Sequence, residues 1–209
     1  LSKERILSEL LKILKLENFF NIIDNKELLE IFRLIFPEFK NINRFKNFKF
    51  LKNHIENSVT LLLAILLVDL QGNHEYFSHK YKVSNKIREN LNLIGNKFKD
   101  FKSSKDFFNK RLKENLYFVG VENLKILYSI SLLDKKKISE QDIAFLKNIK
   151  KISVPKFPFD GKFLIKKGIQ EGKKIGIILK EAEQVWLQNN FNLSSKEFEV
   201  VIKKNTISN

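Results

Sequence analysis

The three histidines are the first residues to examine for acid–base or metal chemistry. His74 and His79 lie on either side of Glu75, in an order that resembles a zinc-protease motif. That motif needs its two histidines four residues apart on one helix face. Here they are five residues apart, which places them about 140° apart around a helix. The two rings cannot share a metal ion, so the sequence predicts structural or surface roles for them.

Other catalytic patterns are absent from the sequence. Phosphoryl transfer needs acidic side chains that hold two metal ions, and its simplest sign, Asp-x-Asp on a strand, does not occur. There is no Gly-x-x-x-x-Gly-Lys-Ser/Thr loop and no Gly-x-Ser-x-Gly elbow. The absence of cysteine excludes thiolate nucleophiles and disulfides, and it fits a reducing compartment such as the cytoplasm. We expect no catalytic centre in this chain alone.

The strongest chemical signal is a run of lysines interleaved with glycines. Residues 156–179 read KFPFDGKFLIKKGIQEGKKIGIIL and hold four of the seven glycines in the chain. From Lys162 to Lys180 there are six lysines and one acidic residue. We expect Gly168 to end a short helix in the left-handed conformation. Gly172 then precedes a second helix, whose free N–H groups can hold a phosphate.

This arrangement predicts a helix–turn–helix clamp on a nucleic-acid backbone, independent of base sequence. The predicted contacts are the lysines on either side of the turn and the backbone at its end: Lys162, Lys166, Lys167, Gly172, Lys173 and Lys174. The alternative is a helical hairpin whose lysines face water and whose glycines, Gly176 included, serve close packing. Physical reasoning alone leaves both open.

A second basic stretch lies between Glu38 and Glu56, where there is no acidic residue. Lysines and one arginine alternate there with phenylalanines. Cations can contact phosphates and aromatic faces can stack on bases, so Arg44, Lys46 and Lys49 form a second predicted patch. In the favoured alternative, the phenylalanines belong to the core and the lysines face water.

Net charge points to a polyanionic partner. The chain has 209 residues, 39 of them basic and 24 acidic, for a net charge of +15. Such a surface favours nucleic acid first and acidic membranes second. The alternative is a genome bias toward lysine. We expect no membrane partner, because the longest apolar run, Val59–Val68, is too short to span a bilayer and no helix joins a broad apolar face to a uniformly cationic one.

Helical patterns dominate the chain, and strand patterns are scarce. Apolar residues recur at helical spacing behind Ser2, behind Asn25 as far as Pro37, within 54–70, and behind Ser84. Ser-x-x-Asp or Ser-x-x-Glu patterns predict further helix starts at Ser103, Ser139 and Ser194. The segment around Pro155 reads as an extended connector. We predict an all-α protein with a multi-helix neck and body over residues 1–150 and a small helical tail over 151–209.

A spaced set of glycine, apolar and tryptophan residues runs through 157–191. Its members are Pro158, Gly161, Leu164, Gly168, Gly172, Ile175, Gly176, Leu179 and Trp186. This pattern resembles the C-terminal signature of the bacterial class II tRNA nucleotidyltransferase and poly(A) polymerase family. The opening LSKERILSEL is similar to the neck of that family, through Glu4, Arg5, Ile6 and Glu9. The helical order between these two segments also fits.

The resemblance implies an RNA-holding role. In that family the body and tail hold the tRNA elbow and acceptor stem, while a head with an Asp-x-Asp pair adds nucleotides from ATP or CTP. The head and the Glu-Asp-x-x-Arg nucleotide template are absent here, so Mg²⁺ and nucleotide would belong to that head and no cofactor is expected in this chain. Arg5 would brace the head. Phe163 and Lys173 stand where the family has an acidic residue and a proline.

Two hypotheses follow. In the first, the chain is the body and tail of such a protein, with tRNA or another structured RNA as partner and a catalytic head in the same chain or a separate one. In the second, it is a free-standing, non-catalytic helical interaction protein that docks a separate head or another protein. A chain that begins at Leu1 and contains no methionine suggests a piece of a longer protein.

Overall fold

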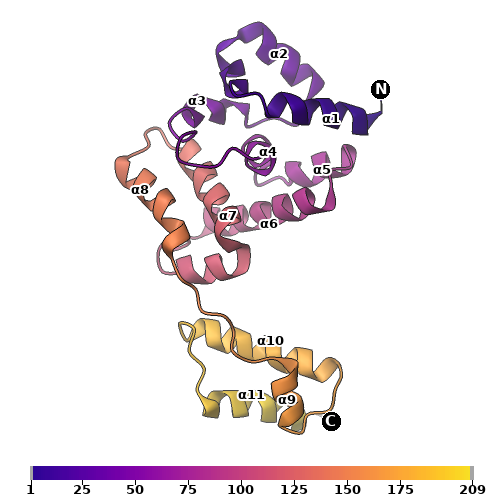
Figure 1. Cartoon of the computed structure of the whole chain (residues 1–209), viewed down its shortest axis with the longest axis vertical. Coiled ribbons are helices and arrows are strands. Elements are labelled where there is room, and N and C mark those ends of the chain that lie inside the picture. The colour runs from indigo at the N-terminus through magenta and orange to yellow at the C-terminus, as the bar shows by residue number, and fades with distance from the viewer. Residues whose placement is uncertain (1, 208–209) are drawn as a thin grey trace. The chain divides into compact units, whose positions relative to one another are not determined.

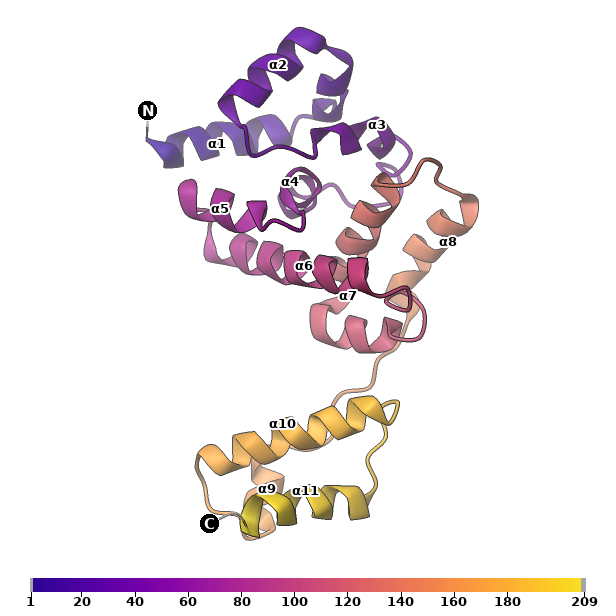
Figure 2. The same ribbon diagram turned by 180° about the vertical axis from the view of Figure 1, so that it is seen from behind.

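The computed structural model describes residues 2–207, and every regular element within them is a helix (Figures 1 and 2). This confirms the predicted all-α class. The chain divides into two compact units, Leu1–Ser153, here called the body, and Val154–Asn209, here called the tail. The sequence had placed this boundary after residue 150.

The body contains eight α-helices and three 3₁₀ turns within the described residues. The helices are α1 (Lys3–Leu14), α2 (Lys26–Ile35), α3 (Phe45–Phe48), α4 (Val59–Leu67), α5 (Asn73–Lys80), α6 (Asn85–Ser103), α7 (Leu112–Leu133) and α8 (Glu140–Asn148). The turns are η1 (Phe19–Asp24), η2 (Ile42–Arg44) and η3 (Ile149–Lys151). The tail has α9 (Gly161–Lys166), α10 (Lys173–Gln188) and α11 (Ser195–Ile207).

Helix α4 is the centre of the body. Residues 61–68 are all buried, and the helix is apolar on every side because α1, α5, α6 and α7 surround it. In Figure 1 its ribbon is seen nearly end-on between α1 and α6. The helix begins later than the predicted residue 54, because Ser58 caps it by accepting a hydrogen bond from the Leu61 amide at 3.2 Å.

Helix α7 is the longest element of the body and packs against α6, α4 and α8. Gly120 interrupts it with a non-helical backbone of positive φ, at φ 75° and ψ 167°. Among the described helices, α7 alone is long and apolar enough to cross a membrane, and most of that apolar stretch is buried inside the body.

Five of the predicted helix starts are confirmed, and the one at Ser103 is wrong. Asn25 directly precedes α2 and Ser84 directly precedes α6, as predicted. Ser2 caps α1, and serine–acid capping pairs begin α8 at Ser139 and α11 at Ser194. Ser103 instead lies in the last turn of α6, where its hydroxyl donates to the Asp100 carbonyl oxygen at 2.9 Å. The hydroxyl is therefore not free to cap a following helix.

The pair of His74 on α5 and Gly95 on α6 sets how closely these two helices pack. His74 is fully buried, and a Cβ atom added at Gly95 would lie 2.2 Å from its Cε1 and Nε2 atoms. Burial lowers the pKa of His74, because the charged form loses its hydration. Its ring is therefore a neutral part of the core, and His79 is exposed, in agreement with the structural or surface roles predicted for these histidines.

The tail is built on α10 and α11, which lie side by side with α9 against α10 (Figure 2). Their core is formed by Leu164, Ile175, Ile178, Ala182, Phe198 and Val201. Two rings from the preceding connector complete it. Phe157 lies 5.4 Å from Trp186, and Phe159 is stacked on Phe198 at 4.3 Å between ring centres. As predicted, the connector, residues 152–160, has no regular structure.

Replacing Gly95 with alanine is expected to destabilise the body by roughly 2 kcal/mol, because the buried imidazole of His74 has no room to move away from the new methyl group. Urea unfolding measures this change. In a His74→Ala background the same substitution should cost much less, and equal costs in both backgrounds would contradict the contact.

The Asp142 carboxylate gives a pH-dependent contribution to stability. Burial raises its pKa, but hydrogen bonds from Lys135, Ser139 and Tyr128 outweigh this and lower the pKa from 3.8 to about 2. A lowered pKa means that the stabilisation is complete above about pH 4 and is lost as the pH falls toward 2. We expect Asp142→Asn to cost about 2 kcal/mol at pH 7. In acid unfolding curves, the difference from the wild type should vanish near pH 2.

Candidate nucleic-acid interface

The turn between α9 and α10 has the backbone that its glycines predict. Gly168 adopts φ 85° just after α9, where its amide donates to the Ile165 carbonyl oxygen at 2.9 Å and so closes the helix. Gly172, at φ 151°, immediately precedes α10, and no side chain caps this helix start. A Cβ atom at either glycine would meet nothing within 4 Å, so backbone conformation is what requires glycine here.

The predicted tail contacts gather on the two helices that this turn joins. Lys162, Lys166 and Lys167 lie in or directly after α9, while Lys173 and Lys174 form the first turn of α10. Lys174 is half-buried and the other four are exposed. Within the described residues none of the five forms an ion pair with an acidic side chain.

The electrostatics of this turn favour an anion. The amino-terminal end of a helix carries a partial positive charge, which acidic residues in the first turn normally offset. Helix α10 has two lysines there and no acidic residue. The carboxylate of Asp160 caps α9, where it accepts from the Phe163 amide at 2.9 Å, and Glu171 is the one acidic residue between the two helices. A phosphate at the start of α10 would therefore relieve a local excess of positive charge.

The expectation that Gly176 allows close packing is wrong. A Cβ atom at Gly176 would meet nothing within 4 Å, because this residue lies on the exposed side of α10. The glycine of the tail that faces a neighbour is Gly161, whose added Cβ would touch the Ile175 side chain at 3.4 Å.

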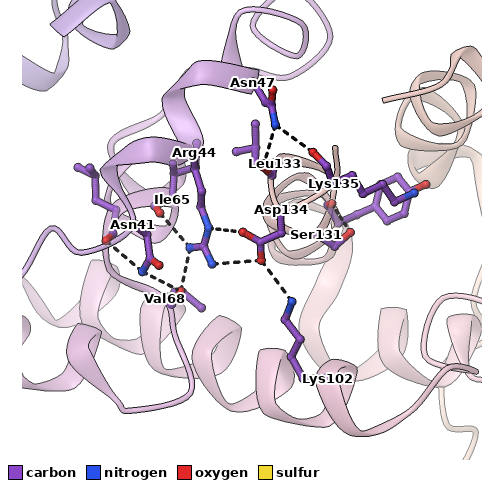
Figure 3. A network of polar contacts seen from close by, with 12 residues as sticks. Asn41, Arg44, Asn47, Ile65, Val68, Lys102, Ser131, Leu133, Asp134 and Lys135 are labelled. Carbon is purple, nitrogen blue, oxygen red and sulfur yellow. Dashed lines mark hydrogen bonds and ion pairs between the residues drawn. The ribbon is translucent and has the colours of Figure 1, made fainter. Parts of the chain in front are cut away.

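Arg44 does not belong to the second basic patch and is a structural residue. Its side chain is only 8% exposed. The guanidinium donates twice to Asp134, at 2.8 and 3.3 Å, and to the carbonyl oxygens of Ile65 and Val68 at 3.0 and 2.8 Å (Figure 3). Because these partners occupy the guanidinium inside the body, Arg44 cannot contact a phosphate.

The rest of the second patch stays on the surface. Lys46 and Lys49 are exposed, whereas Phe45 and Phe48 are buried, which confirms the favoured alternative for these two rings. The neighbouring Phe50 is exposed, with the Lys49 ammonium 5.5 Å from its ring centre.

The body also contains a basic hollow that the sequence did not predict. It has a volume of about 450 Å³, and its lining residues are His54, Lys125, Ala144, Lys147, Asn148, Lys150 and Lys151. The run KNIKK at residues 147–151 was its only sequence signal. Lys125 comes from the middle of α7 and His54 from the loop before α4, and only the fold brings these two to the same place.

No protein-family model matches the sequence, and no curated protein matches it. Within residues 2–207, no group of three or more histidine, aspartate or glutamate side chains is placed to hold a metal ion. The lysines and the geometry around them are therefore the basis for assigning a function.

We expect Arg44→Ala to destabilise the body by about 3 kcal/mol, because it leaves buried carbonyl oxygens and a carboxylate without their donor. Chemical denaturation measures the loss. Lys46→Ala is the matched control, and it should change stability by less than about 0.5 kcal/mol because Lys46 is exposed. Similar small effects for both variants would contradict the structural role of Arg44.

Proposed function

We propose that this chain is an RNA-binding helical scaffold, the body and tail of a protein similar to tRNA nucleotidyltransferases and poly(A) polymerases. Its partner is tRNA or another structured RNA in the cytoplasm, held by the phosphate backbone. Nucleotide addition, with its Mg²⁺ and ATP or CTP, would belong to a catalytic head in the same chain or a separate one.

The observation that carries this proposal is the set of unpaired lysines around the uncapped start of α10. Lys166 and Lys167 lie at the end of α9, before the turn, and Lys173 and Lys174 lie after it in the first turn of α10. With the free N–H groups that follow Gly172, they offer a phosphate both charge and hydrogen-bond donors. Such groups can position an RNA backbone without reading its bases.

The choice of lysine over arginine fits binding that is independent of sequence. Lysine presents a flexible point charge, whereas arginine makes bidentate contacts of fixed geometry. Duplex RNA hides its base edges in a deep, narrow major groove, so shape and phosphate contacts dominate its recognition. A surface of exposed lysines suits a structured RNA of variable sequence.

The residues that resemble the family's signature have consistent places in the tail. Leu164, Ile175 and Trp186 are buried in its interior, and Gly168 and Gly172 are the two residues with positive φ at the turn. Lys173, which stands where the family has proline, is the first residue of α10, a position at which proline is favoured. These placements support the resemblance for the tail.

A second candidate function, docking of a protein partner, is favoured by one face of α2. Leu28, Ile31, Leu34 and Ile35 follow one another at helical spacing and are all exposed, Leu34 by 82%. Contiguous exposed apolar residues of this kind often mark a protein interface. This candidate would apply if the chain acts as an interaction protein and does not bind RNA.

RNA binding should depend steeply on salt through the tail lysines. We expect the purified chain to bind tRNA, with an affinity that falls sharply between about 50 and about 200 mM KCl. Replacing Lys166, Lys167, Lys173 and Lys174 with glutamate should reduce the slope of log K against log salt by roughly 3, since each lost phosphate contact removes close to one unit. Fluorescence anisotropy with labelled tRNA measures both quantities.

A matched control keeps the total charge change the same. Four exposed lysines lie outside the turn: Lys15, Lys26, Lys196 and Lys203. Replacing them with glutamate should lower the affinity for tRNA modestly and leave the slope of log K against log salt mostly unchanged. If both quadruple variants lose binding equally, only net charge matters. If the wild type binds as weakly as either variant, the docking function of α2 is favoured.

A further inference from the structure

The basic hollow of the body lies where α7, the continuous segment of α8 and η3, and the loop before α4 meet. Helix α7 contributes Lys125, the end of α8 contributes Lys147 and Asn148, and η3 contributes Lys150 and Lys151. The loop before α4 adds His54. The hollow is formed within the body alone and shares no residue with the turn at the start of α10.

The charge of its lining is entirely of one sign. Four lysines and a histidine surround it, and no carboxylate is among the lining residues. The side chain of Lys125 is only 13% exposed, and its ammonium lies 3.7 Å from the Glu122 carboxylate, which is longer than a hydrogen bond. Glu122 offsets part of the Lys125 charge, but the three further lysines of the lining add repulsion. A bound anion would remove this repulsion.

The backbone that presents these lysines is fixed. Helix α8 starts at the complete capping box of Ser139 and Asp142. At its other end, Leu146 and Ile149 are fully buried, and η3 packs against both α7 and α8. The lysines at 147, 150 and 151 therefore project from an anchored segment, which lowers the entropy lost when they close on a ligand.

We propose that this hollow binds a multiply charged phosphate, such as a terminal phosphate monoester or a short phosphate chain. Four ammonium groups that line one hollow match an anion that carries two or more charges, more than a single phosphodiester offers. Ala144 and the imidazole of His54 are the only largely non-charged surfaces besides Asn148, so the lining has no broad aromatic platform for a base. The site recognises phosphate and not a nucleobase. This inference does not depend on RNA binding by the tail.

Calorimetric titration of the full chain with inorganic tripolyphosphate, at constant ionic strength, tests the proposal. We expect the tightest site for tripolyphosphate in the wild type to be saturable, and its affinity to fall at least tenfold in the variant Lys147→Glu with Lys150→Glu. The variant Lys196→Glu with Lys203→Glu has the same change in charge but lies in the tail, outside the turn before α10, and it should bind within about twofold of the wild type. Thermal melts confirm that each variant is folded, and Lys147→Gln with Lys150→Gln, which only neutralises the charge, should also bind more weakly.

A competition experiment identifies the source of the phosphate. An oligoribonucleotide with a 5′-phosphate that displaces tripolyphosphate, while its 5′-hydroxyl counterpart does not, would assign the site to phosphorylated RNA ends. Displacement by pyrophosphate but by neither oligonucleotide would assign it to free phosphate chains. The proposal is overturned if the Lys147/Lys150 variants bind tripolyphosphate like the wild type, or if the tail variant loses as much affinity as the hollow variant. These titrations contain no tRNA, so their failure is distinct from failure of the tail to bind RNA.

Discussion

The buried guanidinium of Arg44 is the interaction on which the body depends. It extends from η2, meets the carboxylate at the end of α7, and satisfies two carbonyl oxygens at the end of α4. The Asp134 carboxylate also accepts a hydrogen bond from the ammonium of Lys102, at the end of α6, at 3.3 Å. A charge taken out of water is tolerated only when its hydrogen bonds are satisfied in this way. Four elements are therefore fixed to one another at a single corner (Figure 3).

The same corner determines where the basic hollow can form. The chain leaves α7 at Asp134, turns, and enters α8 through the capping box at Ser139. The side chain of Asn47 holds this exit by donating to the carbonyl oxygens of Leu133 and Lys135, both at 3.1 Å. Because α8 and η3 follow directly, the position of their lysines derives from contacts made by α3 and η2 far earlier in the chain.

Helices were predictable from the sequence because their causes are local. Apolar spacing and serine caps act over three or four residues, so α1, α8 and α11 could be located from their own segments. The predicted helix start at Ser103 was wrong, because a capping pattern does not show whether the preceding helix has already ended. Its hydroxyl bonds back to the carbonyl of Asp100, within the same helix.

Functional assignments depended on contacts between distant segments, which a single sequence does not reveal. Arg44 looked like an exposed cation because its partner, Asp134, lies 90 residues away. Lys125 could not be associated with the hollow for the same reason. The glycines illustrate both the features that local sequence determines and those that distant contacts determine. Gly168 and Gly172 were predictable from a local turn, whereas the tight position is Gly95, which only the buried ring of His74 explains.

Part of the connector between body and tail is a structural component of the tail. Its phenylalanines at 157 and 159 pack on Trp186 and Phe198, so this stretch belongs to the interior of the tail although it has no helical structure. Within the tail, only residues 154–156 precede these packed rings. A tail excised at the first residue of α9 would expose the apolar surface that these rings cover and would be prone to aggregate, whereas one excised at Val154 would carry its whole core with it.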